Sequence, residues 1–378
     1  MDIINVAIVT NVIPNYRSDF YRRIFDCREI NVQVFCQQRI PGTGLETIEK
    51  QFGHRVTVVP FWSLKQEALC WQVLPFRRIS RDYDIIFLYG NPRIISNILC
   101  FLTLKWRRKK IVVWGLARMP GRARIQQMVR IKWWAMFDGA FVYSDREAAW
   151  LKKLWGNEKT VIGMNNGLDQ EVIDKQVSAW PRERLESWRK AKQLSDKVVV
   201  SVARLTKKPQ LNQFMQVLPG LVKKHPDLIW IVIGTGPEAY RLEEAARVNH
   251  VEDHVRFWGA VYSQDELCPL MLAARALVHP GCIGLTILHA FGYGLPVVTH
   301  NNETNQSAEF AAFEDGINGL GFPENDASGL SECVDRLLSD SGLRDSMRTP
   351  ALRTAREVFN TQVMADRFKE MVRAIYYK

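Results

Sequence analysis

The chain lacks several features that would assign it to a class of protein directly. Its seven cysteines are an odd number, with no CxxC pair and no His/Cys spacing of a zinc site, which favours a reduced protein without structural zinc. The first residues, MDIINVAIVTNVIP, do not have the basic segment, long apolar core and cleavage site of a signal peptide, and are typical of a buried strand. The longest apolar run, Ile94 to Leu104, is interrupted by Ser96 and Asn97 and is too short to span a bilayer.

Length and composition favour a large globular protein. The 378 residues exceed one typical domain, which predicts two domains of similar size. Apolar residues make up 47% of the chain and aromatic residues 11%, which is enough for large cores and excludes a mainly disordered protein.

The excess of positive charge lies in the first half. Residues 1–170 contain 26 Lys and Arg against 14 Asp and Glu, whereas the rest of the chain contains 25 against 26. The densest segment, Lys105 to Lys132, alternates basic residues with tryptophans, which suits an anionic membrane surface. Nucleic acid is the competing partner, and a solvated helix face needs no partner. The uneven charge favours the membrane, and no nucleic acid is expected. The segment includes Trp106, Arg107, Arg108, Lys109, Lys110, Trp114, Arg118, Arg122, Arg124, Arg130, Trp133 and Trp134.

Short β-branched runs alternate with amphipathic segments in both halves. This alternation predicts an α/β fold of two Rossmann-like, doubly wound domains that face a central cleft. We expect residues 1–178 to form the N-terminal domain, with a C-terminal helix over 362–378 packing back on it. The polar segment 179–196, which contains Pro181, is the expected linker, and residues 197–361 form the C-terminal domain.

Three loops that follow predicted strands of the C-terminal domain contain cations or glycines. Val202–Lys208 has one arginine and two lysines, which offer a bidentate fork and point charges to a diphosphate. Gly234–Glu238 is a glycine turn that leads into a helix. In Pro280–Asn302, Gly284-Leu285 precedes a helical run and can present unpaired N–H groups to an anion. Each loop singly also fits an ordinary surface turn, but together they predict a nucleotide-diphosphate site.

These loops are part of a longer pattern. The runs VVVSVARLTKKPQL, WIVIGTGPEAYRLEEAA, HVRFWGAV, HPGCIGLTILHAFGYGLPVV and AEFAAFEDGINGLGF resemble retaining glycosyltransferases of family 4, which use nucleotide sugars and have the GT-B fold. The resemblance is most specific over residues 197–325. In the first half, VIPNYRSDFYRRI is similar to the acceptor-side opening of members that decorate bacterial cell-surface glycans, and VVWG and NNGLD are also typical.

The resemblance implies roles for individual residues of a donor site. Arg204 and Lys208 would neutralise the donor diphosphate and stabilise its departure, and Lys207 would replace Lys208 if the register of this short loop differs. The amides of Gly284 and Leu285 would bind the distal phosphate. Further donor residues are Gly234 and Gly236 of the glycine turn, Ala260 and Tyr262 beside the base, His289 near the ribose, and Glu309, which is alternatively a helix N-terminal carboxylate.

The chain departs from the family pattern at three positions. Members usually carry two glutamates separated by seven residues where this chain has Gly281 and His289. They often carry a histidine that touches the transferred sugar where this chain has Leu116. Subfamily variation or a catalytically silent protein would each explain these changes.

The function implied by the resemblance is retaining transfer of a hexosyl unit from a UDP- or GDP-sugar to a hydroxyl of a lipid-linked saccharide, in bacterial surface polysaccharide or lipopolysaccharide synthesis. The N-terminal domain would bind the acceptor, with Asn15, Tyr16 and Arg17 lining the acceptor side. A front-face displacement requires no side-chain nucleophile, cofactor or metal, in keeping with a sequence that has no convincing Ser-His-Asp or metal-ligand pattern.

The expected location is the cytoplasm, peripheral on the inner face of the membrane. Three alternatives stay open at this point. The chain could be a silent GT-B partner that binds a nucleotide sugar without turnover, or a nucleic-acid-binding protein that uses the basic segment. It could also be another GT-B-fold enzyme, such as an epimerase or a phosphorylase.

Overall fold

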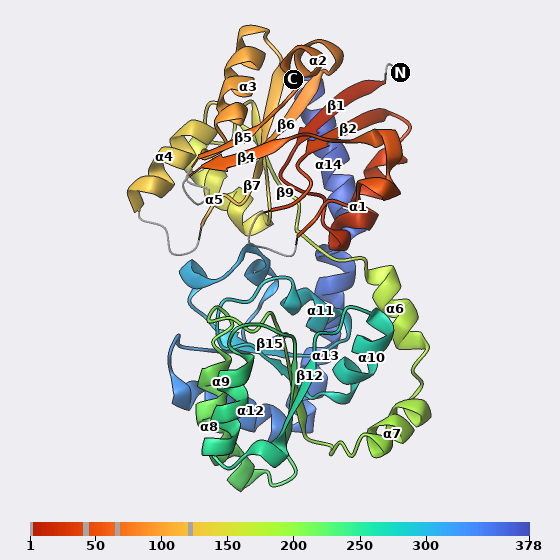
Figure 1. The fold of residues 1–378 in the computed structure, drawn as a ribbon, viewed down its shortest axis with the longest axis vertical. Coiled ribbons are helices and arrows are strands. Elements are labelled where there is room, and N and C mark those ends of the chain that lie inside the picture. The colour runs from red at the N-terminus through yellow and green to blue at the C-terminus, as the bar shows by residue number, and fades with distance from the viewer. Residues whose placement is uncertain (1–2, 41–44, 65–68, 120–123) are drawn as a thin grey trace. The chain divides into compact units, whose positions relative to one another are not determined.

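The protein consists of two compact α/β units in the computed structural model (Figure 1). The first unit contains residues 1–169 and 361–378, and the second contains residues 170–360. The described residues are 3–40, 45–64, 69–119 and 124–378.

The first unit is built on a parallel sheet with the strand order β3-β2-β1-β6-β7-β8-β9. A separate antiparallel hairpin pairs β4 (Phe61–Leu64) with β5 (Leu69–Gln72). The β-branched runs of the sequence become sheet strands because helices bury both of their faces. The strands of the sheet are β1 (Ile4–Val9), β2 (Ile30–Cys36), β3 (Val56–Val58), β6 (Ile85–Tyr89), β7 (Lys110–Gly115), β8 (Gly139–Val142) and β9 (Thr160–Gly163).

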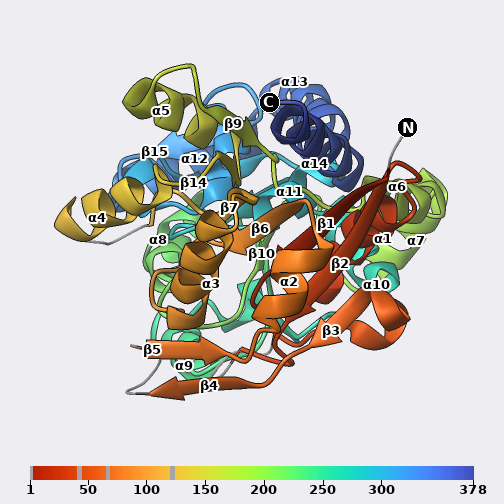
Figure 2. The same cartoon turned by 90° about the horizontal axis from the view of Figure 1, so that it is seen from above.

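Helices cover the two faces of this sheet in separate groups (Figure 2). On one face, Val6 and Ile8 pack with α1 (Ser18–Phe25) and α14 (Thr361–Tyr376). On the other face, Ala7 and Val9 pack with the remaining helices. Within the described residues, no helix is both long and apolar enough to cross a membrane. The helices of the second group are α2 (Phe76–Asp82), α3 (Ile95–Trp106), α4 (Arg124–Trp134) and α5 (Asp145–Trp155).

The second unit has a parallel sheet with the order β12-β11-β10-β13-β14-β15. Its core combines strand residues such as Val199 and Trp230 with the inner faces of α8 and α12. The strands are β10 (Val198–Val202), β11 (Ile229–Ile233), β12 (Val255–Gly259), β13 (Ala276–Val278), β14 (Val297–His300) and β15 (Gly319–Phe322). The helices are α6 (Gln170–Ser178), α7 (Arg182–Ala191), α8 (Leu211–Lys224), α9 (Ala239–Val248), α10 (Gln264–Ala273), α11 (Thr286–Gly292), α12 (Ala327–Ser339) and α13 (Ser341–Arg353).

The division of the chain differs from the sequence prediction at the linker. Residues 170–178, predicted in the N-terminal domain, form α6 of the second unit, where Gln170 Nε2 donates to the Gly292 carbonyl at 3.2 Å. The predicted linker 179–196 contains α7, held by an edge-to-face contact of Trp188 with Trp180 and a tilted contact with Trp258, with ring centroids 6.0 and 6.3 Å apart. The high charge of this segment concealed its two anchoring tryptophans. Residues 361–378, by contrast, lie in the first unit.

Candidate nucleotide-diphosphate site

The three predicted loops follow neighbouring strands of the second sheet. Strand β10 pairs in parallel with β11 on one side and with β13 on the other. The loops that begin after Val202, Ile233 and Val278 therefore leave the same carboxyl edge of the sheet side by side.

Backbone hydrogen bonds join these loops into one cluster. The Leu205 N–H donates to the Thr235 carbonyl at 2.9 Å, and the Glu238 N–H donates to the Leu205 carbonyl at 2.9 Å. On the other side, the Gly281 N–H donates to the Pro209 carbonyl at 2.9 Å, and the Cys282 N–H donates to the Lys208 carbonyl at 3.2 Å. The cationic loop is thus held between the two glycine turns.

Three glycines of the cluster are required by this close packing. Gly234 has φ +143°, and a Cβ added to it would lie 1.8 Å from the Ala203 carbonyl oxygen. A Cβ at Gly236 would lie 2.3 Å from the Leu205 carbonyl oxygen. A Cβ at Gly281 would lie 2.2 Å from the Lys208 carbonyl oxygen, so the glutamate usual at this position does not fit beside this loop. At Gly281, the departure from the pattern that the resemblance implies coincides with a backbone contact that leaves no room for a Cβ.

Gly284 differs from these glycines because the protein leaves room around it. The nearest atoms to an added Cβ would be Ser307 Oγ at 3.8 Å and Glu309 Oε2 at 3.9 Å, which are ordinary contact distances. Among the described residues, the N–H groups of Gly284 and Leu285 have no hydrogen-bond acceptor. Two unpaired amides therefore lie where the protein leaves room for a small group, and the Glu309 carboxylate, in the 3-10 helix Ala308–Ala312, borders this position.

The three cations of the loop make no internal ion pairs. Arg204, Lys207 and Lys208 are exposed, and their side chains make no hydrogen bond or salt bridge within the described part of the chain. A cavity of about 480 Å³ borders Lys207. Cations that are not neutralised by the protein, beside unpaired amides, form an arrangement that can bind a diphosphate.

Gln306 positions the Gly284 turn, and sequence reasoning missed it. Its buried side chain accepts from the Ile283 N–H at 2.7 Å and donates to the His300 carbonyl at 2.8 Å. This amide therefore fixes the residue that precedes Gly284. The signal in the sequence was weak, since Gln306 lies in the polar run NNETNQS with no pattern that distinguishes it from a surface loop.

Two histidines of the site are neutral near pH 7. The pKa of His279 is lowered to about 4, mainly by burial and also by the nearby Lys208, although a hydrogen bond from the ring to the Cys282 carbonyl at 3.2 Å acts to raise it. Burial also lowers the pKa of His289 to about 4. The Nδ1 atom of His289 is buried and has no hydrogen-bond partner in the described structure. An uncharged His289 can exchange a hydrogen bond with a hydroxyl group but offers no charge to a ligand.

The segment predicted to hold the base is only partly connected to the cluster. The Gly259 carbonyl accepts from the Gly234 N–H at 2.7 Å, so Ala260 begins beside the glycine turn. Tyr262 is 93% exposed and makes no hydrogen bond among the described residues. The structure therefore brings Ala260 to the cluster and leaves the Tyr262 side chain in solvent.

The predicted acceptor residues form the turn Asn15–Arg17 after β1. Asn15 is exposed, whereas Arg17 is buried, donates from Nη2 to Asn166 Oδ1 at 3.1 Å, and lies over the Tyr143 ring at 5.1 Å. The Arg17 side chain thus contacts the interior of the first unit, and Asn15 is the most accessible residue of the three. Leu116 lies at the end of β7, where its carbonyl accepts from Arg130.

The basic segment 105–132 does not present a single charged face. Trp114 and Trp134 are core residues, and Arg130 is buried. Lys105 pairs with Asp138 at 2.7 Å, and Arg122 lies outside the described residues. The even spacing of charges and tryptophans in the sequence does not reveal that β7 and α4 turn their tryptophans inward. The exposed members among the described residues are Trp106, Arg107, Arg108, Arg118, Arg124 and Lys132.

A metal site is not evident from the described side chains. No group of three or more His, Cys, Asp and Glu residues is arranged to hold a metal ion within 3–40, 45–64, 69–119 and 124–378. The charged groups of this cluster are the cations of the Arg204–Lys208 loop and the Glu309 carboxylate beside Gly284.

Solved structures with this fold are GT-B glycosyltransferases. The crystal structure of Anabaena Alr3699/HepE in complex with UDP matches with a TM-score of 0.72 at 15% identity, over 98% of this chain and 100% of that chain. The apo form of the lipopolysaccharide outer core galactosyltransferase WaaB matches with a TM-score of 0.65 at 12% identity, over 98% and 99%. The predicted fold class of two doubly wound domains is confirmed.

The match in sequence lies in the second unit. Residues 183–353 match the model of the family described as glycosyl transferases group 1. The lipopolysaccharide core biosynthesis glycosyltransferase LpsE of Rhizobium meliloti (strain 1021) is 25% identical over 181 residues, which are 46% of this chain and 49% of that protein. The chain spans about half the length of the curated relatives it matches first. The resemblance to GT-B glycosyltransferases is confirmed, while family 4 itself stays a prediction.

Proposed function

We propose that this protein is a retaining glycosyltransferase that moves a hexosyl unit from a nucleotide sugar to a hydroxyl group of a lipid-linked saccharide. The observation that carries the proposal is the cluster in the second unit, where the cations Arg204, Lys207 and Lys208 adjoin the unpaired amides of Gly284 and Leu285. The nucleotide is UDP, since HepE was crystallised with UDP and has the same fold.

The reaction breaks the bond between the anomeric carbon and the diphosphate and forms a bond from that carbon to the acceptor oxygen. Arg204 and Lys208 hold the leaving diphosphate, and the amides of Gly284 and Leu285 bind its distal phosphate. The acceptor proton passes to the leaving phosphate oxygen on the same face, which retains the configuration. Charge-assisted hydrogen bonds of this kind contribute about 1.5–3 kcal/mol each, and they strengthen as charge develops on the leaving group.

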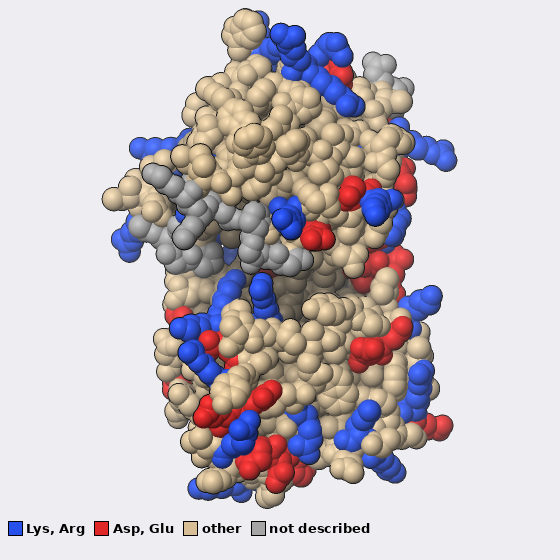
Figure 3. Space-filling view, in the orientation of Figure 1, with Lys and Arg blue, Asp and Glu red and all other residues tan. Residues whose placement is uncertain are grey.

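An apolar surface on the first unit supports a lipid-linked acceptor. Large exposed apolar side chains lie on the β4–β5 hairpin, on α3, which contacts β5, and on α4, including Trp62 at 68%, Trp106 at 82% and Ile125 at 76% exposed. Figure 3 shows a broad area without charged side chains on this unit, with Lys and Arg at its margins. Exposed Arg107 and Arg124 lie beside these apolar residues, as anionic headgroups above an apolar interior require.

A cavity in the first unit also fits an amphiphilic acceptor. It has a volume of about 360 Å³ and is lined by Met119, Ile125 and Val129, with Arg93 among its polar residues. An apolar chain and an anionic group on one molecule would match this lining. The proposed location is the inner face of the cytoplasmic membrane, with the protein bound peripherally.

The donor site is tested with UDP binding by calorimetry. Arg204→Ala and Lys208→Ala are each expected to weaken UDP binding about tenfold or more, because each loses a charge-assisted contact to the diphosphate. The matched control is Arg247→Ala, which removes an exposed arginine at the end of α9 and so changes the net charge by the same amount. Equal UDP affinity in all three variants and the parent would overturn the donor site.

Turnover separates the enzyme from a silent binding protein. Incubation with a UDP-hexose and vesicles that carry a polyprenyl-diphosphate saccharide is expected to release UDP and to form a product with the donor's anomeric configuration, read by NMR. UDP binding with no release for any UDP-hexose would favour the silent partner, the alternative that His289 and Gly281 keep open. Binding to duplex DNA in place of anionic vesicles would favour the nucleic-acid alternative.

A further inference from the structure

A second charged cavity lies at the opposite end of the strands of the second sheet. Its volume is about 250 Å³. Three of its lining residues come just before strands: Asp196 before β10, Arg275 before β13 and Pro296 before β14. These strands are parallel, so the cavity is at their amino ends, whereas the predicted diphosphate loops leave their carboxyl ends. The two sites are therefore separate.

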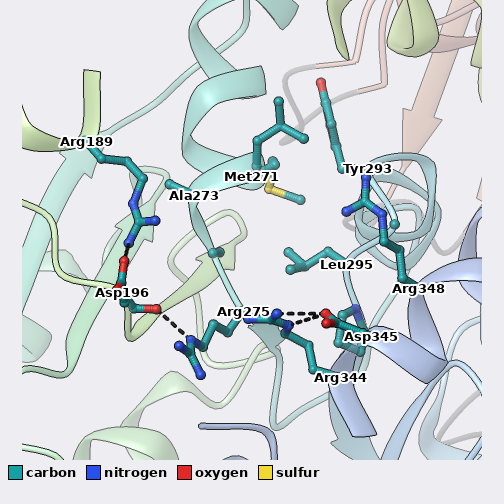
Figure 4. Close-up of a pocket in the computed structure, with 14 residues that line it drawn as sticks. Arg189, Asp196, Met271, Ala273, Arg275, Tyr293, Leu295, Arg344, Asp345 and Arg348 are labelled. Atoms are coloured by element: carbon teal, nitrogen blue, oxygen red, sulfur yellow. Dashed lines mark hydrogen bonds and ion pairs between the residues drawn. The ribbon is translucent and has the colours of Figure 1, made fainter. Parts of the chain in front are cut away.

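Four arginines from three parts of the fold surround this cavity (Figure 4). Arg189 comes from α7, Arg275 precedes β13, and Arg344 and Arg348 lie one turn apart on α13. Figure 4 shows their side chains around one space, with the apolar Leu295 and Met271 at its back. The convergence of cations from distant sequence positions is not what an ordinary charged helix face produces.

Two of these arginines are neutralised by carboxylates. Arg189 Nη2 pairs with Asp196 Oδ1 at 2.8 Å. Arg344 Nη2 pairs with Asp345 Oδ1 at 2.7 Å. These pairs use both aspartates that line the cavity.

The other two arginines have no carboxylate partner among the described residues. Arg275 donates from Nε to the Asp196 carbonyl at 2.6 Å and from Nη1 to the Leu338 carbonyl at 3.0 Å. Arg348 is exposed and makes no hydrogen bond or ion pair, and its aliphatic part lies against Gly294. Among the residues that line the cavity, four arginines therefore stand against two aspartates.

The surroundings of Arg275 also favour an anion. Burial lowers the pKa of Arg275, and the charges of Arg344 and Arg189 also lower it, whereas the carboxylates of Asp196 and Asp227 raise it. An anion between these arginines would remove this repulsion. The first turns of α13, which begins at Ser341, add the partial positive charge of a helix N-terminus to the same side.

We propose that this cavity binds a phosphate group, either free inorganic phosphate or the phosphate of a small phosphorylated molecule. Arg275 and Arg348 form the charged contacts, and Arg344 contributes from its pair with Asp345. A volume of about 250 Å³ accommodates a phosphate with its waters or a small monoester. Guanidinium groups match the geometry of phosphate oxygens.

The test is titration of the full chain with inorganic phosphate, followed by thermal shift and calorimetry at ionic strength matched with chloride. Saturating UDP occupies the cations of the donor loop. If UDP does not bind, the same titration is run on the Arg204→Ala/Lys208→Ala double variant. Failure of the proposed function and failure of the phosphate cavity are then distinguishable.

Arg348→Ala is the informative variant because its side chain has no internal partner whose loss would unfold the protein. It is expected to weaken phosphate binding about tenfold or more, while Arg348→Lys retains part of the affinity and the control Arg247→Ala retains all of it. A sugar phosphate is titrated in parallel. Tighter binding of inorganic phosphate identifies the free anion as the ligand, and tighter binding of the sugar phosphate identifies an ester. The proposal is overturned if phosphate stabilises the protein no more than chloride, or if Arg348→Ala binds phosphate as the parent does.

Discussion

Replacing Gly284 by alanine isolates the contribution of the backbone amides to donor binding. An alanine Cβ would lie 3.8 Å from Ser307 Oγ and 3.9 Å from Glu309 Oε2, and Gly284 does not have a positive φ. The protein thus tolerates the methyl group, and the reduced entropy of the unfolded chain is expected to raise the free energy of unfolding by about 0.4–1 kcal/mol. The methyl group instead narrows the approach to the amides of Gly284 and Leu285.

A phosphate that needs both amides would lose at least one charge-assisted hydrogen bond in Gly284→Ala. At about 1.5–3 kcal/mol per bond, UDP binding weakens about tenfold to a hundredfold. Calorimetry with UDP and urea unfolding on the same preparation give the two quantities. Unchanged UDP affinity would refute the role of these amides.

Gly281→Ala, three residues earlier in the same loop, is the matched comparison for Gly284→Ala. Its Cβ would lie 2.2 Å from the Lys208 carbonyl oxygen and 2.7 Å from the Pro209 carbonyl carbon, so the cationic loop must move. We expect a loss of about 1–3 kcal/mol in the free energy of unfolding, in contrast to Gly284→Ala. If the two variants unfold alike, the packing argument for the loop cluster is wrong.

Three further predictions concern stability and membrane binding. Gly234→Ala should lower the free energy of unfolding by about 3 kcal/mol or more, because Gly234 has φ +143° and an added Cβ would lie 1.8 Å from the Ala203 carbonyl oxygen. Gly220→Ala, within α8 and with no atom near the added Cβ, should raise it by about 0.5–1 kcal/mol. Urea unfolding measures both. The pKa of His279 is about 4 in the folded protein against an ordinary value of 6.5, so the unfolded chain binds this proton first as pH falls. Between pH 7 and pH 5 the free energy of unfolding of the parent should therefore fall by about 2 kcal/mol more than that of His279→Asn. Trp106→Ser should weaken binding to anionic vesicles about tenfold in a sedimentation assay, while Tyr240→Ser, an exposed aromatic on the second unit, should not.

Regular amphipathic segments were the most predictable part of the fold. Helix α8, Leu211–Lys224, is an example, because its apolar residues recur at helical spacing over its whole length. The β4–β5 hairpin was not predicted, since FWSL and LCWQ are short and expose most of their apolar side chains. Helix α13 was also missed, because its only buried side chains are those of Met347 and Ala351.

The loop cluster was predictable because its residue types have few alternatives. Gly234 and Gly281 must be glycines because an added Cβ would lie 1.8 and 2.2 Å from a carbonyl oxygen. Glycines of this kind are recognisable in the sequence as turns. Gln306 was not predictable, since its role depends on burial against the Ile283 amide and not on a local pattern. The inward orientation of Trp134 was hidden for the same reason: charge and aromatic spacing in a sequence do not report which side of a helix meets the sheet.

The return of α14 to the first unit sets the order in which the chain can fold. Phe368 packs on Phe87 and Phe141 with ring centroids 4.9 and 6.1 Å apart, and Thr361 Oγ1 donates to Asp19 Oδ2 at 2.6 Å. During synthesis, residues 170–360 leave the ribosome before α14 and can fold while the strands of the first unit still lack this helix. The first unit is therefore completed last, and a chain that ends before residue 361 leaves the part of one sheet face that α14 covers open to solvent and to chaperones.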